Sequence, residues 1–229
     1  MKQRPSCPVT PDVKRPHLIL GLAFLGAVVI LAWVAAPSRA ADSVSETRKV
    51  SGFDRIRLAG AFETVVTVGE PASLTLSGDP EAVGRIMTEV GGGTLIIGTH
   101  SDGWPFHQMV KLTITLPALH GFASEGVGPS TISGLAGGDI EISTAGAGSI
   151  VASGRAENED VSLSGVGKID TTALDARDVT VSNSGLGTVH VRASGNLTMS
   201  VSGLGTIRYT GNPSHVESQI SGLGRIGRL

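Results

Sequence analysis

The sequence has little cysteine and few aromatic residues. Its single cysteine is Cys7, so the chain can form no internal disulfide bond and no thiolate metal site. Aromatic residues make up only 3% of the 229 residues, whereas glycine occurs 32 times. Small and β-branched side chains favour narrow layers of β-strands over a bulky globular core. Stability must therefore come from packing and from backbone hydrogen bonds.

Positive charge is scarce beyond the first 41 residues. That segment holds five basic residues and one acidic residue, which leaves 13 basic and 19 acidic residues in the rest of the chain. Nucleic-acid binding requires a basic surface that displaces counterions from phosphates. The sequence therefore predicts no nucleic-acid partner.

Residues 1–41 contain one uncharged apolar run, from Leu18 to Ala36. A signal peptide cleaved between Ala40 and Ala41 is one interpretation, because small residues precede that bond. A retained signal anchor is the other, because about 20 apolar residues span a bilayer. Both interpretations send the following chain out of the cytoplasm. We therefore expect a cell-envelope protein, either periplasmic or exported, or else anchored in the inner membrane by residues 18–36.

A Gly-x-Gly motif recurs six times in the second half of the chain, at intervals of 20, 19, 20, 18 and 19 residues. A period near 20 is typical of solenoids. The residue between the two glycines is always apolar. These middle residues are Val127, Ala147, Val166, Leu186, Leu204 and Leu223.

The residues around each motif keep the same phase. An aliphatic residue follows the middle position by three, as at Ile150 and Ile169, and the first repeat reaches Ile132 only after a two-residue insertion. Polar and apolar residues alternate before the motifs, which indicates strands with one buried face. Stacked coils would align the aliphatic residues into columns that only neighbouring coils can cover. We expect the glycines at a tight corner, where they reach positive φ and leave room.

The predicted fold is therefore an all-β, right-handed parallel β-helix with coils of about 19 residues over residues 50–229. Residues 42–49 are expected to be a linker, 50–117 the irregular first coils and cap, and 118–229 the regular repeats. A β-sandwich is the alternative, but it does not require one motif at one phase in six successive units.

The irregular region also predicts one short helix near residues 80–90. Asp79 suits the N-cap, Pro80 suits the first helical position, and Gly91 ends a helix that runs to about Val90. Residues 99–109 are expected to form a loop. The expected strands are residues 55–58, 63–68, 73–76, 94–97 and 111–116.

Three features resemble the head GIN domain family of auto-transporter adhesins. They are the opening Gly-Phe-Asp-Arg-Ile at Gly52–Ile56, the Gly-Thr-Leu-Ile-Ile strand at Gly93–Ile97, and the Ser-Gly-Leu-Gly coils. The resemblance covers about residues 50–229. It implies an exported β-solenoid of largely unassigned function, for which the adhesin label is itself an inference, and it transfers no functional residue to this chain.

Acidic residues recur once per coil, at Asp139, Asp160 and Asp178, with Asn196 in the next coil. Side-chain capping of turns explains such a pattern. The alternative is a carboxylate cluster that acts on a polysaccharide, since glycoside hydrolysis requires two carboxylates facing one bond. The histidines lack zinc spacing, and no nucleophile elbow occurs. We therefore predict no catalytic residue, no metal site and no cofactor.

One loop concentrates the scarce aromatic residues. Trp104, Phe106 and His107 lie there, and exposed aromatics stack on sugar rings or anchor a protein partner. The alternative is that the two aromatics fold back to cap the solenoid.

The last coil contains no polar cap, so its open edge favours end-to-end self-association unless Arg225 and Arg228 blunt that edge.

The leading hypothesis is a non-catalytic binding or structural module that contacts a glycan, a surface or a protein through flat Ser/Thr-rich faces. The alternatives are a polysaccharide-acting β-helix enzyme and a membrane-anchored envelope sensor or accessory protein. A groove with three or more carboxylates and a basic residue would favour the enzyme.

Overall fold

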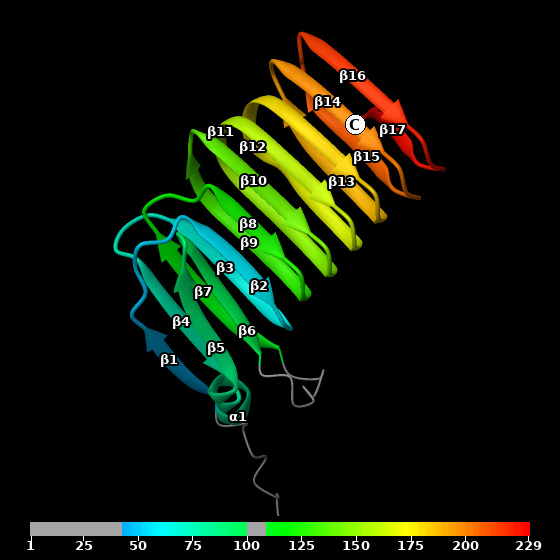
Figure 1. Cartoon of the computed structure of the whole chain (residues 1–229). Coiled ribbons are helices and arrows are strands. Elements are labelled where there is room, and N and C mark those ends of the chain that lie inside the picture. Colours follow the sequence, from blue (N-terminus) through cyan, green and yellow to red (C-terminus); the bar gives the residue numbers. More distant parts are fainter. Residues whose placement is uncertain (1–42, 100–108) are drawn as a thin grey trace, which may run out of the picture. The chain divides into compact units, whose positions relative to one another are not determined.

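The protein is described by a computed structural model that covers residues 43–99 and 109–229. Its 17 strands form one continuous hydrogen-bonded sheet, which is accompanied by one short helix. The sheet winds into a β-solenoid (Figure 1). The predicted solenoid is confirmed, because the regular repeats pair in parallel from coil to coil, which a β-sandwich does not do.

The strand boundaries lie within about two residues of those expected for the irregular region. The elements in chain order are β1 (Val44–Arg48), β2 (Arg55–Ala59), β3 (Phe62–Val68), β4 (Ser73–Gly78), α1 (Pro80–Gly84), β5 (Ile86–Gly91), β6 (Thr94–Thr99), β7 (Val110–Leu116), β8 (Gly121–Ser124), β9 (Val127–Ala136), β10 (Asp139–Thr144), β11 (Ala147–Leu163), β12 (Val166–Asn183), β13 (Leu186–Ala193), β14 (Asn196–Val201), β15 (Thr206–Gly211), β16 (His215–Ile220) and β17 (Arg225–Arg228).

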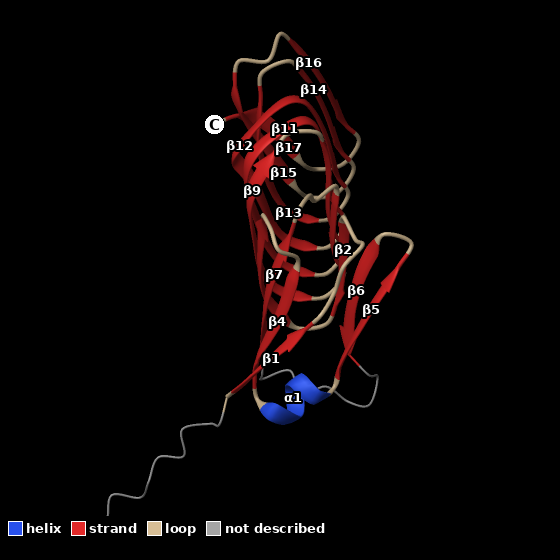
Figure 2. Cartoon of the chain, turned by 90° about the vertical axis from the view of Figure 1, so that its left-hand side faces the viewer, coloured by secondary structure: helices blue, strands red, loops and turns tan. Residues whose placement is uncertain are grey.

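Each regular coil has two walls of strand joined by two corners (Figure 2). One corner carries the Gly-x-Gly motif. β11 and β12 run through the opposite corner without a break, and they pair in parallel from Ala147↔Val166 to Leu163↔Asn183. β1 comes from the segment that the sequence assigns to a linker, and it pairs antiparallel with β4.

The aliphatic columns lie between the two walls. Ile150, Ile169, Val189 and Ile207 occupy successive positions of one column and are buried. The first repeat departs from this column. Ser130 lies opposite Ile150, whereas Ile132 lies opposite Ala152. The inserted residues therefore move the isoleucine to the next inward position of the strand.

The glycines lie at a corner, as expected, but mainly for a different reason. Among the motif glycines of the described chain, only Gly128 has a positive φ. The amide of Val166 donates to the carbonyl oxygen of Gly146 at 2.9 Å, and Leu186 donates likewise to Gly165 at 3.0 Å. A Cβ on Gly165 would overlap that Gly146 oxygen. The motif is glycine because the backbone of the preceding coil occupies the space of a side chain.

The helix α1 is shorter than the sequence predicts. Asp79 caps it by accepting hydrogen bonds from the amides of Glu81 (2.9 Å) and Ala82 (3.3 Å), and Pro80 is at its start. The expected continuation to Val90 is wrong, because residues 86–91 form β5 and pair antiparallel with β6. The reason is the turn that follows. Gly92 and Gly93 both have positive φ, which is typical of a tight β-hairpin.

The helix α1 lies at the N-terminal end of the solenoid, beside β1 and β4 (Figure 2). Its residues Ala82 and Val83 are buried in the core. At the other end, every residue of β16 is exposed. The two ends of the solenoid are therefore covered to different extents.

The close backbone contact at the glycine corner predicts that adding a side chain there destabilises the fold. Gly165→Ala should destabilise the fold by about 3 kcal/mol or more, because the added methyl group has only backbone to displace. Thermal unfolding of the full-length protein, followed by far-UV circular dichroism, would measure the change. Gly84→Ala is the matched control, since a Cβ there meets nothing within 4 Å. Equal stability of the two variants would contradict this account of the corner.

Candidate binding face and its two hollows

One exposed sheet surface carries rows of polar side chains that continue from coil to coil. It is formed by β2, β8, β10, β14 and the second halves of β11 and β12, and we call it the outer face. A row of small residues runs along it from coil to coil, and a second row beside it carries acids and threonines. The first row is Ala123, Ser143, Ser162, Ser182 and Ser200. The second row is Glu141, Asp160, Thr180 and Thr198.

The first hollow in this face has a volume of about 500 Å³. We call it the serine hollow, because small residues form its floor. Thr94 and Ile96 of β6 contribute to one side of it. Two ion pairs flank the floor. Arg57 Nε lies 3.3 Å from Glu125 Oε1, and Arg55 Nη1 lies 3.0 Å from Glu141 Oε2. The floor residues are Gly121, Ala123, Ser143 and Ser162.

The Arg55–Glu141 pair connects residues that are two strands apart. Gly121 lies between them in the sheet, since it pairs with Arg55 on one side and with Glu141 on the other. A Cβ at Gly121 would lie 3.0 Å from Arg55 Nη1. The arginine therefore reaches the glutamate only because the intervening residue has no side chain. Both partners remain about half exposed, at 49% and 58%, so a ligand can reach them.

The second hollow has a volume of about 570 Å³. We call it the acidic hollow. It shares Arg55 and Glu141 with the serine hollow, so the two are contiguous. It satisfies the condition that favours the enzyme alternative, because many carboxylates share it with Arg55 and His120. These carboxylates belong to Asp54, Asp139, Glu141, Asp160 and Asp178.

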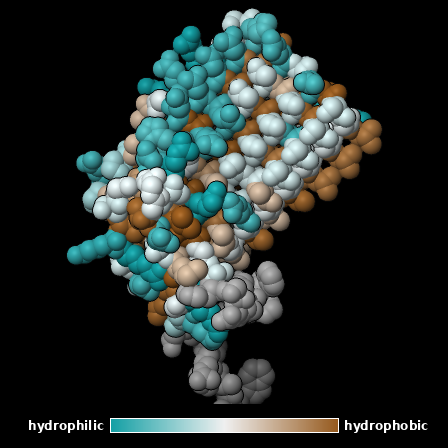
Figure 3. Space-filling model, viewed as in Figure 1, coloured by the Kyte–Doolittle hydropathy of each residue, from teal (hydrophilic) through white to brown (hydrophobic). Residues whose placement is uncertain are grey.

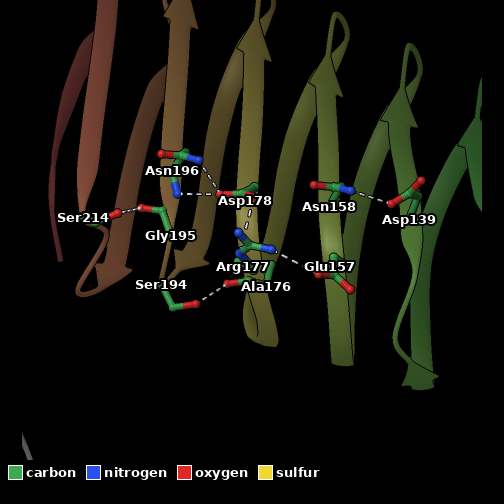
Figure 4. A network of polar contacts seen from close by, with 10 residues as sticks. All are labelled: Asp139, Glu157, Asn158, Ala176, Arg177, Asp178, Ser194, Gly195, Asn196 and Ser214. Carbon is green, nitrogen blue, oxygen red and sulfur yellow. Dashed lines mark hydrogen bonds and ion pairs between the residues drawn. The ribbon is translucent and has the colours of Figure 1, made fainter.

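Several of these carboxylates have structural partners at the second corner of the coil (Figure 4). Asp139 accepts a hydrogen bond from the Asn158 amide at 2.7 Å. Asp178 accepts from both the backbone (2.7 Å) and the side chain (2.8 Å) of Asn196. Aspartate and asparagine therefore alternate along this corner, which keeps like charges one coil further apart. Both aspartates are therefore bonded to the asparagine of the next coil, which is a structural ladder between coils and differs from the expected capping of a turn.

Asp160 does not belong to that corner row, in contrast to the sequence-based pattern. Asn158 takes its place, and Asp160 lies opposite Glu141 and Thr180 on the outer face. Partial burial, together with the nearby charge of Glu141, raises the pKa of Asp160. Two neighbouring coils thus present one carboxyl with a raised pKa beside one that is paired with Arg55.

The remaining predicted site residues cannot be placed. Trp104, Phe106 and His107 lie outside the described residues, as do the run Leu18–Ala36 and the Ala40–Ala41 bond. In residues 43–99 and 109–229, no helix has the length and apolar character needed to span a membrane. The same residues contain no group of three His, Cys, Asp or Glu side chains suited to a metal ion.

A family profile described as "Putative auto-transporter adhesin, head GIN domain" matches residues 52–213. The chain belongs to this head GIN domain family. The expected resemblance is thereby confirmed. The family description indicates an exported or cell-surface protein. A search of curated proteins found no match.

A solved structure supports the fold of this head GIN domain. A protein described as a putative adhesin from Bacteroides fragilis NCTC 9343 is 24% identical with a TM-score of 0.68, over 82% of this chain and 97% of that one. A protein described as a putative lipid binding protein from Parabacteroides distasonis ATCC 8503 is 20% identical with a TM-score of 0.47, over 82% of this chain and 96% of that one. At 24% identity, the Bacteroides fragilis structure is evidence for the solenoid fold alone.

The head GIN domain also contains a buried carboxyl that the sequence analysis missed. Glu159 lies in an inward-facing column between Ile140 and Val179, and it is 2% exposed. Neither of its oxygens has a hydrogen-bond partner in the described part of the chain. Burial raises its pKa from 4.5 to about 8. The nearby Thr171 hydroxyl lowers the pKa of Glu159 by less than burial raises it. The hydrogen bond of that hydroxyl goes to the His190 carbonyl.

Stability should therefore depend on pH through Glu159. The folded protein holds this proton more tightly than the unfolded chain, so the free energy of unfolding should fall as pH rises from 4.5 to about 8, by at most about 1.4 kcal/mol per pH unit. Glu159→Leu should remove that slope and add about 1–3 kcal/mol at pH 8. Urea unfolding at several pH values would measure both effects. The exposed-site control Glu89→Gln should keep the slope, and a Glu159→Leu variant that also keeps it would refute the assignment.

Proposed function

We propose that this head GIN domain is a non-catalytic binding module of the cell envelope, and that its serine hollow holds a segment of a glycan chain. The observation that carries the proposal is the form of the hollow. It combines a flat floor of small residues with two accessible Arg–Glu pairs. A sugar ring needs both a surface to lie on and polar groups around its edge.

The two ion pairs suit a ligand rich in hydroxyl groups. Each guanidinium of Arg55 and Arg57 offers several N–H donors, and the carboxylates of Glu125 and Glu141 offer acceptors. A hydroxyl group both donates and accepts, so it can bond to either member of a pair. Because each pair carries no net charge, the hollow favours a neutral or weakly charged glycan over a strongly charged polymer.

The location agrees with this role. The apolar run at residues 18–36 predicts export, and the family description indicates an exported or cell-surface protein. If the run is retained, it tethers the binding module to the inner membrane. In that case, the same hollow would serve an envelope sensor or accessory protein.

A glycan array incubated with the full-length chain in mild detergent would test the proposal. Arg57→Ala should lower the affinity for a bound glycan at least about tenfold, because a charged hydrogen bond contributes about 1.5–3 kcal/mol. Ser143→Tyr should abolish binding by filling the floor. Lys111→Ala is the matched control, because Lys111 forms a comparably exposed ion pair with Glu63 outside the hollow. Undiminished binding by Arg57→Ala and Ser143→Tyr would reject the serine hollow as the site.

The acidic hollow supports a second candidate function, the cleavage of a glycosidic bond. The pKa of Asp160 is raised by partial burial and by the charge of Glu141, which suits a group that donates a proton to the leaving oxygen, while Glu141 beside Arg55 would act as the second carboxylate. Neighbouring strands lie about 4.8 Å apart. Retaining glycosidases place their two carboxyl groups about 5–5.5 Å apart. The pairing of adjacent coils thus brings these two residues close to that range.

Catalysis and binding make different predictions for Asp160. If the chain cleaves a glycan, reducing ends should accumulate with time, and Asp160→Asn should lower that rate at least about a hundredfold. Asp139→Asn, in the same hollow but bonded to Asn158, should leave the rate nearly unchanged. A glycan that binds yet releases no reducing ends would eliminate the enzyme candidate and retain the binding module.

A further inference from the structure

One row of apolar side chains lies on the outside of the solenoid. It consists of the residues between the paired glycines, and we call it the aliphatic stripe. Its members are Val127, Ala147, Val166, Leu186, Leu204 and Leu223. The exposed fractions of the five larger residues are 46%, 55%, 51%, 60% and 86%, in chain order. Figure 3 shows apolar residues in a continuous row along one edge of the solenoid.

The stripe stands up as a ridge. The glycines on both sides of each stripe residue leave a trough without side chains along each flank, as in Gly165-Val166-Gly167. Serines such as Ser164 and Ser184 border one trough. An apolar ridge with a trough on each side can interdigitate with a second ridge. Because such an exposed row costs solubility, it points to a partner that covers it.

The spacing of the stripe limits what that partner can be. The first four members, Val127 to Leu186, are direct partners in the parallel sheet, as Ala147 is of Val127 and of Val166. They therefore recur every 4.8 Å or so. A second solenoid of this kind repeats at the same interval over all six coils. Six coils extend about 29 Å, so two such stripes can stay in step along their whole length.

The side chains of the stripe also change in size along the chain. The first three are Val, Ala and Val, and the last three are Leu. Two stripes laid antiparallel would place Leu223 against Val127, Leu204 against Ala147 and Leu186 against Val166. Every contact then joins one large and one small residue, so the distance between the two solenoids stays uniform along the stripe. A parallel arrangement would bring leucines together at one end and small residues at the other, which would wedge the solenoids apart.

We propose that the aliphatic stripe is the contact surface for a second copy of this chain, packed antiparallel about a two-fold axis near Val166 and Leu186. A bilayer is a poorer partner, because the chain beyond residue 41 carries 13 basic and 19 acidic residues and anionic lipids repel it. The stripe lies at the glycine corner rather than on the floor of either hollow. Pairing therefore leaves the acidic hollow free, whereas the serine hollow adjoins the contact, since Ala145 and Ser164 line it two residues before Ala147 and Val166.

Cysteine cross-linking distinguishes the arrangements, because Cys7 is the only native cysteine. Two full-length copies with different tags, both carrying Cys7→Ser, would be coexpressed in bacterial cells and oxidised before non-reducing electrophoresis. A copy with Leu223→Cys should cross-link to a copy with Val127→Cys. Neither variant expressed alone should cross-link to itself. Absence of the mixed dimer, or self-cross-linking of each variant, would overturn the antiparallel pairing.

A second substitution shows whether the stripe holds the dimer together. Leu204→Asp, added to both copies, should lower the yield of the Leu223→Cys and Val127→Cys dimer at least tenfold. The substituted side chain is exposed, so folding should persist, which circular dichroism would verify. Met87→Asp is the matched control, because Met87 is a 46% exposed apolar residue on β5, away from the stripe. An unchanged yield with Leu204→Asp would show that another surface joins the copies.

Discussion

The hydrogen bond at the glycine corner determines much of this structure. The amides of Ala147, Val166 and Leu186 each donate to the carbonyl of the first motif glycine one coil earlier, as between Val166 and Gly146 at 2.9 Å. This close approach excludes a Cβ at the motif glycines. It also leaves the middle residue as the one side chain of the motif, and the turn directs it outward. The constraint that stacks the coils therefore also produces the exposed aliphatic stripe.

The regular coils could be predicted because their signal is local and repeated. The spacing of the motifs defines the coil, and the alternation on either side defines which residues face inward, as for Ile150 and Ile169. The irregular region, residues 50–117, could be predicted less accurately. Its helix ends at Gly84 because Gly92 and Gly93 build a hairpin turn that recruits the preceding residues into β5. A propensity for helix in a short segment loses to the pairing of a strand with its neighbour.

The candidate site was harder to predict, because it joins residues far apart in sequence. Arg55 and Glu141 meet only because the irregular first coils and the regular repeats share one sheet. The coils also vary in length from 18 to 20 residues. For that reason Asn158, and not Asp160 as the sequence pattern predicts, lies beside Asp139 at the second corner. Glu159 is different. It shares the inward phase of Val161 and Leu163, so the alternation alone contained the signal that its carboxyl is buried.

Arg55 links the two hollows, and the choice between binding and cleavage depends on it. Its guanidinium reaches across Gly121 to Glu141, and Glu141 in turn lies opposite Asp160. Partial burial raises the pKa of Asp160, and the nearby charge of Glu141 raises it further. If a ligand drew Arg55 away into the serine hollow, Glu141 would lose the counter-charge that lies 3.0 Å from it, and its negative charge would act more strongly on Asp160. Occupation of the serine hollow would therefore alter the acid–base state of the acidic hollow, so the two sites act as one unit.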